Sequence, residues 1–136
     1  MEEFSFERLD VYKRSLEFVR KIRRFCEAKK GRLSYFTLDQ LGRAALSIPL
    51  NLAEGSGRWH INEKKKFFWI ARGSVYETVS VMKVIEMDGQ IEKSEYDGLR
   101  NDLLDISMMI TKLAKSMDRI QTQRPTMIDD RSTFRE

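Results

Sequence analysis

Apolar residues recur at alternating intervals of three and four positions along most of this chain. The pattern is clearest near the C-terminal end, where the apolar positions are Tyr96, Leu99, Leu103, Ile106, Ile110, Leu113 and Met117. This spacing places all of them on one side of an α-helix, because a helical turn takes about 3.6 residues. A stripe of about two positions in seven is typical of helices that pack nearly parallel in a bundle.

Three earlier segments carry stripes of the same kind. The first, over residues 8–29, comprises Leu9, Tyr12, Leu16, Val19, Ile22 and Cys26. The second comprises Leu38, Leu41, Ala45, Ile48 and Leu52. The third comprises Phe67, Ala71, Ser74, Val75, Thr78, Met82 and Ile85. Because short connections make successive helices antiparallel, we predict an all-α fold, an antiparallel up-down-up-down four-helix bundle.

Residues that commonly cap helices punctuate these segments. Thr37, Asn62 and Ser94 are the predicted N-caps of the second, third and fourth helices. Gly31 and Gly89 are predicted to end the first and third helices in the left-handed conformation that glycine adopts at low cost. The bundle is thus predicted to occupy residues 1–118, followed by a flexible C-terminal tail at 119–136, where no apolar period is found.

The stretch IPLNLAEGSGRW, residues 48–59, combines a proline inside an apolar repeat with two glycines. The stripe continues across Pro49, so we expect a kink in the helix rather than its end. A glycine loop can cradle phosphate, but this one follows a helix and lacks the Gly-Lys-Ser/Thr ending of a P-loop. We therefore predict that Gly55 or Gly57 ends the helix in a left-handed conformation.

Composition narrows the class of protein. The 136 residues suit one domain, and the single cysteine, Cys26, excludes an internal disulfide. The first ten residues are acidic and lack the apolar core of a secretory signal. The sequence has no run of about 18 apolar residues. We predict a cytoplasmic protein that does not span a membrane.

Residues suited to catalysis or metal binding are scarce. His60 is the one histidine of the chain, whereas a metal site needs several ligands. A ferritin-like site would need Glu-x-x-His motifs, which are absent. Glu54 is expected to pair with Arg58, and Glu77 with Arg72. We predict no metal, no cofactor and no enzymatic activity.

Positive charge is concentrated in two stretches. Residues 13–32 hold nine Lys or Arg against two Glu, and residues 58–72 hold five against one. Residues 73–118 are acidic, with nine Asp or Glu against five Lys or Arg. Cationic side chains bind phosphates, and aromatic neighbours can stack on unpaired bases. The predicted nucleic-acid-binding residues are Lys13, Arg20, Lys21, Arg23, Arg24, Lys64, Lys65 and Lys66.

Two other interpretations of these charges stay open. A basic run is often only a solvated face, or it can complement the acidic stretch of a neighbouring copy. Phe68, Trp69 and Ile70 widen the apolar arc of the third helix, and Leu104 and Met108 do the same for the fourth. A wide arc indicates burial on two sides, which favours a scaffold that binds another protein or its own copies.

Three stretches resemble a known protein family. They are FERLDVYKRSLEFVRKI, LGRAALSIPLNLAEGSGR and KKKFFWIARGSVYETVSVM, and they extend over about residues 4–117. They resemble intervening-sequence proteins, which are encoded within insertions in bacterial large-subunit ribosomal RNA genes. The signature residues in this chain include Pro49, Asn51, Glu54, Gly55, Gly57, Arg58, Arg72, Gly73 and Glu77.

The resemblance implies a four-helix bundle that assembles as a homopentamer around an axis. It also implies kinship with the accessory variability proteins of diversity-generating retroelements, which are basic pentamers that bind nucleic acid and a reverse transcriptase. RNA or DNA and a reverse-transcriptase-like protein are therefore the partners that the resemblance suggests. We further expect Asn51, Glu54, Arg58, Arg72 and Glu77 to share one polar cluster that holds helices or subunits in register.

Overall fold

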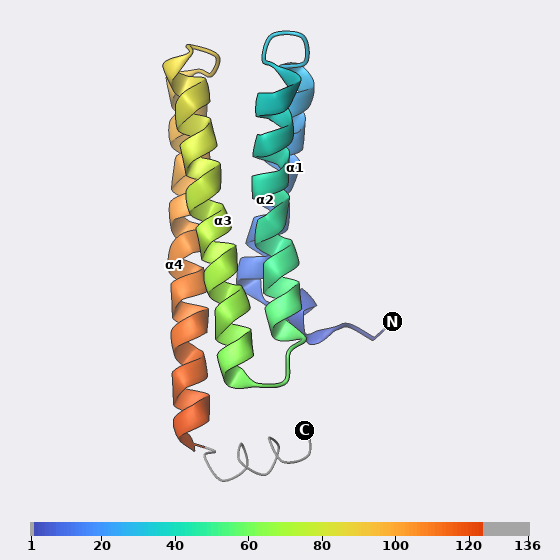
Figure 1. Ribbon diagram of the computed structural model, residues 1–136, viewed down its shortest axis with the longest axis vertical. Coiled ribbons are helices and arrows are strands. Elements are labelled where there is room, and N and C mark those ends of the chain that lie inside the picture. Colours follow the sequence, from blue (N-terminus) through green and yellow to red (C-terminus); the bar gives the residue numbers. More distant parts are fainter. Residues whose placement is uncertain (1, 124–136) are drawn as a thin grey trace.

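The computed structural model of the chain describes residues 2–123. After the short 3₁₀ helix η1 (Ser5–Arg8), four α-helices follow in order: α1 (Asp10–Ala28), α2 (Tyr35–Ser56), α3 (Ile61–Met87) and α4 (Lys93–Gln123). Successive helices are joined at alternate ends of the molecule and run antiparallel (Figure 1). The predicted all-α four-helix bundle is confirmed.

The ends of the helices differ from the expectations in detail. The hydroxyl of Ser34, rather than Thr37, caps α2 by accepting a hydrogen bond of 3.2 Å from the backbone N–H of Thr37. Asn62 lies two residues after His60, the N-cap of α3, and Ser94 is the second residue of α4, so these two predicted N-caps are also wrong. α4 continues to Gln123, five residues into the predicted tail, and residues 124–136 lie outside the described part of the chain.

Gly31 and Gly89 have positive φ angles of 83° and 70°, as predicted for the turns that follow α1 and α3. Gly55 and Gly57 do not, so the predicted left-handed cap of α2 is wrong. Gly57 ends the helix with a right-handed backbone, at φ −81°. Gly55 is buried within α2, where an added Cβ would lie 2.8 Å from Cε1 of Phe68. Its role is therefore to let α3 approach α2.

Pro49 is buried inside α2, and the helix is continuous through it. The prediction that α2 does not end at the proline is confirmed. The expected kink stays a prediction.

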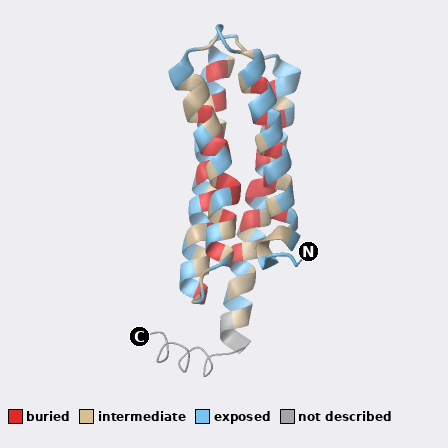
Figure 2. Ribbon diagram, turned by 90° about the vertical axis from the view of Figure 1, so that its right-hand side faces the viewer, coloured by how far each residue is buried: buried red, intermediate tan, exposed pale blue. Residues whose placement is uncertain are grey.

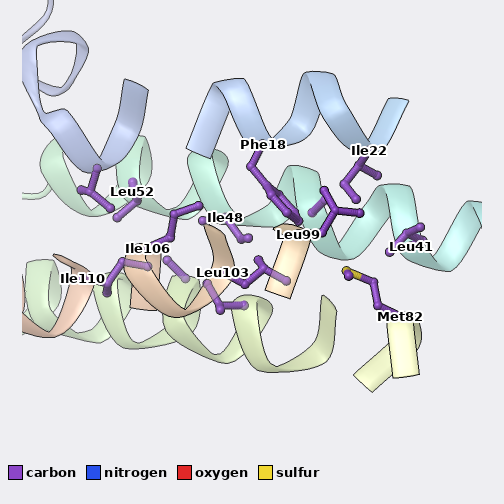
Figure 3. Packing of buried hydrophobic residues seen from close by; sticks show 14 of the residues in the cluster. Phe18, Ile22, Leu41, Ile48, Leu52, Met82, Leu99, Leu103, Ile106 and Ile110 are labelled. Carbon is purple, nitrogen blue, oxygen red and sulfur yellow. The ribbon is translucent and has the colours of Figure 1, made fainter. Parts of the chain in front are cut away.

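The buried residues line the inner sides of the helices, and the outer sides are exposed (Figure 2). The predicted stripes supply most of the core on α2, α3 and α4, including Leu41, Ile48, Met82, Leu103 and Ile106 (Figure 3). On α1 the predicted stripe is displaced by one position. The buried residues of this helix are Val11, Ser15, Phe18, Ile22 and Phe25.

Apart from Ile22, the residues of the predicted stripe lie beside the buried side of α1. Tyr12, Val19 and Cys26 are partly buried there, whereas Leu16 is 40% exposed. The Cys26 thiol lies 3.8 Å from the carbonyl oxygen of Leu38, to which it donates. Burial raises the pKa of this thiol above its usual range. Cys26 is thus a packing residue between α1 and α2.

Candidate nucleic-acid interface

The outward side of α1 is basic. Its buried residues Phe18 and Ile22 point into the bundle, so Arg20, which lies between them in the sequence, points away. Lys13, seven residues before Arg20, and Arg24, four residues after it, lie on the same side of the helix, and Arg23 lies beside them. All four side chains are exposed and make no ion pair with any residue in the range 2–123. We call these four residues the α1 basic face.

Two other cations of α1 face α4 instead. The Lys21 ammonium pairs with Asp102 at 2.7 Å, and the Arg14 guanidinium pairs with Asp105 at 3.2 Å. Part of the acidic charge of residues 73–118 is therefore matched within the same chain. Lys21, predicted to bind nucleic acid, has a carboxylate partner already.

The second basic stretch lies at the opposite end of the bundle from the α1–α2 loop, in the first turns of α3 (Figure 1). Lys64 donates a hydrogen bond of 2.8 Å to the carbonyl oxygen of Ser56 at the C-terminus of α2. Burial lowers the pKa of Lys64 below that of a free lysine. Lys65 pairs with Asp118 of α4, and Lys66 is exposed without an ion pair inside residues 2–123. The structure therefore does not bring Lys64–Lys66 together with the α1 basic face.

The polar signature residues form separate contacts rather than the single cluster that we expected. Asn51 donates from its side-chain amide to the carbonyl and hydroxyl oxygens of Ser47, at 2.8 and 2.9 Å. The Ser47 hydroxyl lies 2.7 Å from that of Ser74, which links α2 to α3. Glu54 pairs with Arg58 at 2.7 Å, as predicted. These contacts follow one another along the line where α2 meets α3.

The predicted pair between Glu77 and Arg72 is not formed. Glu77 accepts a hydrogen bond from the side chain of Gln40 on α2. Arg72 donates to the Tyr76 hydroxyl at 2.7 Å, four residues along its own helix. The prediction is wrong because the two side chains leave α3 in different directions, five positions apart on the helix.

Both signature arginines stack on aromatic rings. The Arg58 guanidinium lies 4.6 Å from the centre of the Phe67 ring, and that of Arg72 lies 4.8 Å from the ring of Tyr76 and 5.9 Å from that of Trp69. The Nε atoms of Arg58 and Arg72 are buried and have no hydrogen-bond partner within the described chain. Such contacts stabilise a partly desolvated cation by about 0.5–2 kcal/mol. The role of these arginines within one chain is therefore structural.

Two exposed aromatic residues that the apolar pattern did not predict, Tyr35 and Phe36, lie at the start of α2. Their signal was present, because they follow the basic segment KKGR (residues 29–32) after only Leu33 and Ser34. It was missed because the segment GRLSYF was expected to be a loop, with the second helix beginning after Thr37.

Neither a metal site nor a membrane span is found in the part of the chain that the structure describes. Residues 2–123 hold no group of three or more His, Cys, Asp or Glu side chains placed to bind a metal ion. No helix within that range is long and apolar enough to cross a bilayer.

The fold and these surfaces define an all-α four-helix-bundle protein with a basic outer face on its first helix. The chain belongs to the 23S rRNA-intervening sequence protein family, whose model matches residues 7–112. A crystal structure of a protein of unknown function from the S23 ribosomal protein family of Bacteroides thetaiotaomicron has a similar fold, with a TM-score of 0.73. It is 21% identical, and the similarity covers 77% of this chain and 98% of that one. No curated protein matches this chain.

Proposed function

We propose that this chain is a cytoplasmic, non-enzymatic protein that binds nucleic acid through the α1 basic face. The observation that carries the proposal is that Lys13, Arg20, Arg23 and Arg24 share one exposed side of α1 without carboxylate partners in residues 2–123. A cation that lacks a partner in the free protein gains one when it meets a phosphate, and the nucleic acid releases a counterion.

The acidic residues on this side of α1 leave an excess of positive charge. Glu17 and Glu27 lie on the same side, and Glu27 already pairs with Lys30 at 3.1 Å. Arg20, Arg23, Arg24 and Glu27 border a shallow surface hollow near the end of the helix. The three arginines are thus close enough together to contact neighbouring phosphates of one strand.

The direct test is charge reversal. We expect Arg20/Arg23/Arg24→Glu to abolish binding of a fluorescently labelled 20-nucleotide RNA, measured by anisotropy at low salt. The matched control is Lys112/Lys115/Arg119→Glu, which changes the net charge of the exposed side of α4 by the same amount and should retain most of the binding. If the α4 variant loses binding and the α1 variant keeps it, the interface is placed on the wrong helix.

A second proposed property is self-assembly, and exposed apolar side chains of α3 and α4 favour it. Tyr76, Leu104 and Met108 are 56%, 53% and 63% exposed, and Trp69 is 39% exposed. A groove of about 240 Å³ runs between the two helices, and its lining includes Val75, Tyr76, Val79, Leu103 and Leu104. We call Trp69, Tyr76, Leu104 and Met108 the α3–α4 apolar face, and we propose that another copy of the chain covers it. Five copies is the number that the family resemblance suggests.

A further inference from the structure

The hairpin between α1 and α2 carries two aromatic side chains that the core does not use. Tyr35 and Phe36 begin α2, and they are 81% and 77% exposed. An aromatic side chain stabilises a fold through the area that it buries, so a side chain in water contributes little. Folding of the single chain therefore does not explain why two aromatic residues stand at this position.

Positive charge precedes this aromatic pair along the chain. Lys29, Lys30 and Arg32 lie between the last residue of α1 and the first residue of α2. Arg32 is exposed and makes no ion pair within residues 2–123. Eight positions separate Arg20 from the end of α1, a rise of about 12 Å. Positive charge therefore continues along the chain from the α1 basic face into the loop that leads to Tyr35.

We propose that Tyr35 and Phe36 form a stacking platform for unpaired RNA bases, continuous with the phosphate-binding α1 basic face. The proposal rests on the nucleic-acid function above and narrows its ligand to single strands. Bases stack on exposed aromatic rings with little regard to sequence, because every base has a π-face. A duplex keeps its bases stacked on one another, so it offers these rings no free face.

An anionic membrane is the other surface that exposed aromatic and basic residues can meet. The carboxylates at this end of the bundle argue against a membrane contact. The α3–α4 loop lies at the same end as the α1–α2 loop (Figure 1), and it contains Asp88 and Glu92, with Glu86 in the last turn of α3 before it. A membrane that met this end of the bundle would approach those carboxylates as well as the basic loop. A single strand of RNA can avoid these carboxylates, because it can run from Tyr35 and Phe36 along α1, away from the α3–α4 loop.

The first test compares oligouridine of 20 nucleotides with an RNA duplex of 20 base pairs by fluorescence anisotropy. We expect Tyr35→Ser/Phe36→Ser to bind oligouridine at least about tenfold more weakly than the unchanged protein. Its binding to the duplex should be unchanged, because the α1 basic face is intact. The control is Met87→Ser, which removes an apolar side chain that is 75% exposed at the same end of the bundle. This control should bind oligouridine normally.

A second measurement reads stacking directly. In Phe36→Trp the added indole should lose fluorescence when oligouridine binds, beyond any change that Trp59 and Trp69 show in the unchanged protein. The duplex should cause no such loss. A residue with only a structural role would show no difference between the two RNAs.

The outcomes separate this proposal from the one on which it rests. In one outcome, the unchanged protein binds single and double strands alike, and Tyr35→Ser/Phe36→Ser binds both normally. If Arg20/Arg23/Arg24→Glu then binds neither RNA, the platform is overturned and the proposed function stands. If the unchanged protein binds neither RNA, both are overturned. If the serine variant loses only its binding to phosphatidylserine vesicles, the hairpin is a membrane contact and the platform is again overturned.

Discussion

At the scale of single residues, Gly55 shows why a signature glycine is needed inside a helix. An added Cβ would lie 2.8 Å from Cε1 of Phe68 and 3.0 Å from Cβ of Phe67. Gly55→Ala should therefore lower the free energy of unfolding by about 1 kcal/mol, because the cost of overpacking exceeds the gain in helix propensity. Urea unfolding at one protein concentration measures this change.

Gly42→Ala is the matched control for that experiment. Gly42 lies in the same helix, and an added Cβ there would meet nothing within 4 Å. This substitution should raise the free energy of unfolding by about 0.5–1 kcal/mol. Equal stabilisation by both substitutions would contradict the close approach of α3 at Gly55.

Sequence reasoning misjudged Gly55 for a physical reason. A glycine near the end of a helix is compatible both with a left-handed cap and with a close helix approach. Only the position of the Phe68 ring, which comes from another helix, distinguishes the two. The Arg72 contact with Tyr76 was missed because the prediction paired Arg72 with the nearest carboxylate, Glu77, although Tyr76, four positions on, is the residue that shares a helix side with it.

At the scale of elements, the apolar spacing predicted the buried side of α4 well and that of α1 poorly. On α4 the predicted stripe is more apolar than the other sides of the helix. Its residues Tyr96, Leu99 and Leu103 are buried as expected. On α1 two neighbouring stripes are both apolar, and the arrangement of α2 and α4 decides which one is buried. The start of α2 was missed because Ser34 and Thr37 were both plausible caps, and that of α3 because its N-cap, His60, makes no side-chain cap hydrogen bond.

Lys64 links two elements, since its ammonium caps the C-terminus of α2 from the first turn of α3. Its lowered pKa means that the unfolded chain binds more protons than the folded chain between the folded pKa and that of a free lysine. The free energy of unfolding should therefore gain a contribution that rises with pH across that window. Below the folded pKa this contribution has its lowest value.

Lys64→Met isolates the contribution of this one lysine. The free energy of unfolding of the unchanged protein minus that of the variant should increase as the pH rises through the window. Denaturant titrations at several alkaline pH values measure it. A difference that stays constant with pH would show that Lys64 is not desolvated.

At the scale of the whole molecule, self-assembly should depend on the α3–α4 apolar face. Leu104→Glu/Met108→Glu places two charges on this face at positions that are exposed in the single chain, so the bundle should still fold. Light scattering should then report the mass of one chain, 16.1 kDa, instead of a multiple of it. The control is Leu50→Glu on α2, which is 59% exposed and should leave the assembly intact.

Two results would contradict this account of assembly. An unchanged protein of 16.1 kDa at micromolar concentration would show that no copy covers the α3–α4 apolar face. Dissociation by Leu50→Glu alone would place the contact on α2 instead.

We propose that arginines of the α1 basic face neutralise phosphates, a claim that fixes how binding depends on salt concentration. The logarithm of the association constant for a single strand falls with the logarithm of the salt concentration by about 0.7 per phosphate contacted. Arg20/Arg23/Arg24→Gln should therefore reduce the magnitude of this slope for oligouridine by about 2, besides weakening the binding. An unchanged slope in this variant would contradict the claim, because it would mean that these arginines contact no phosphate.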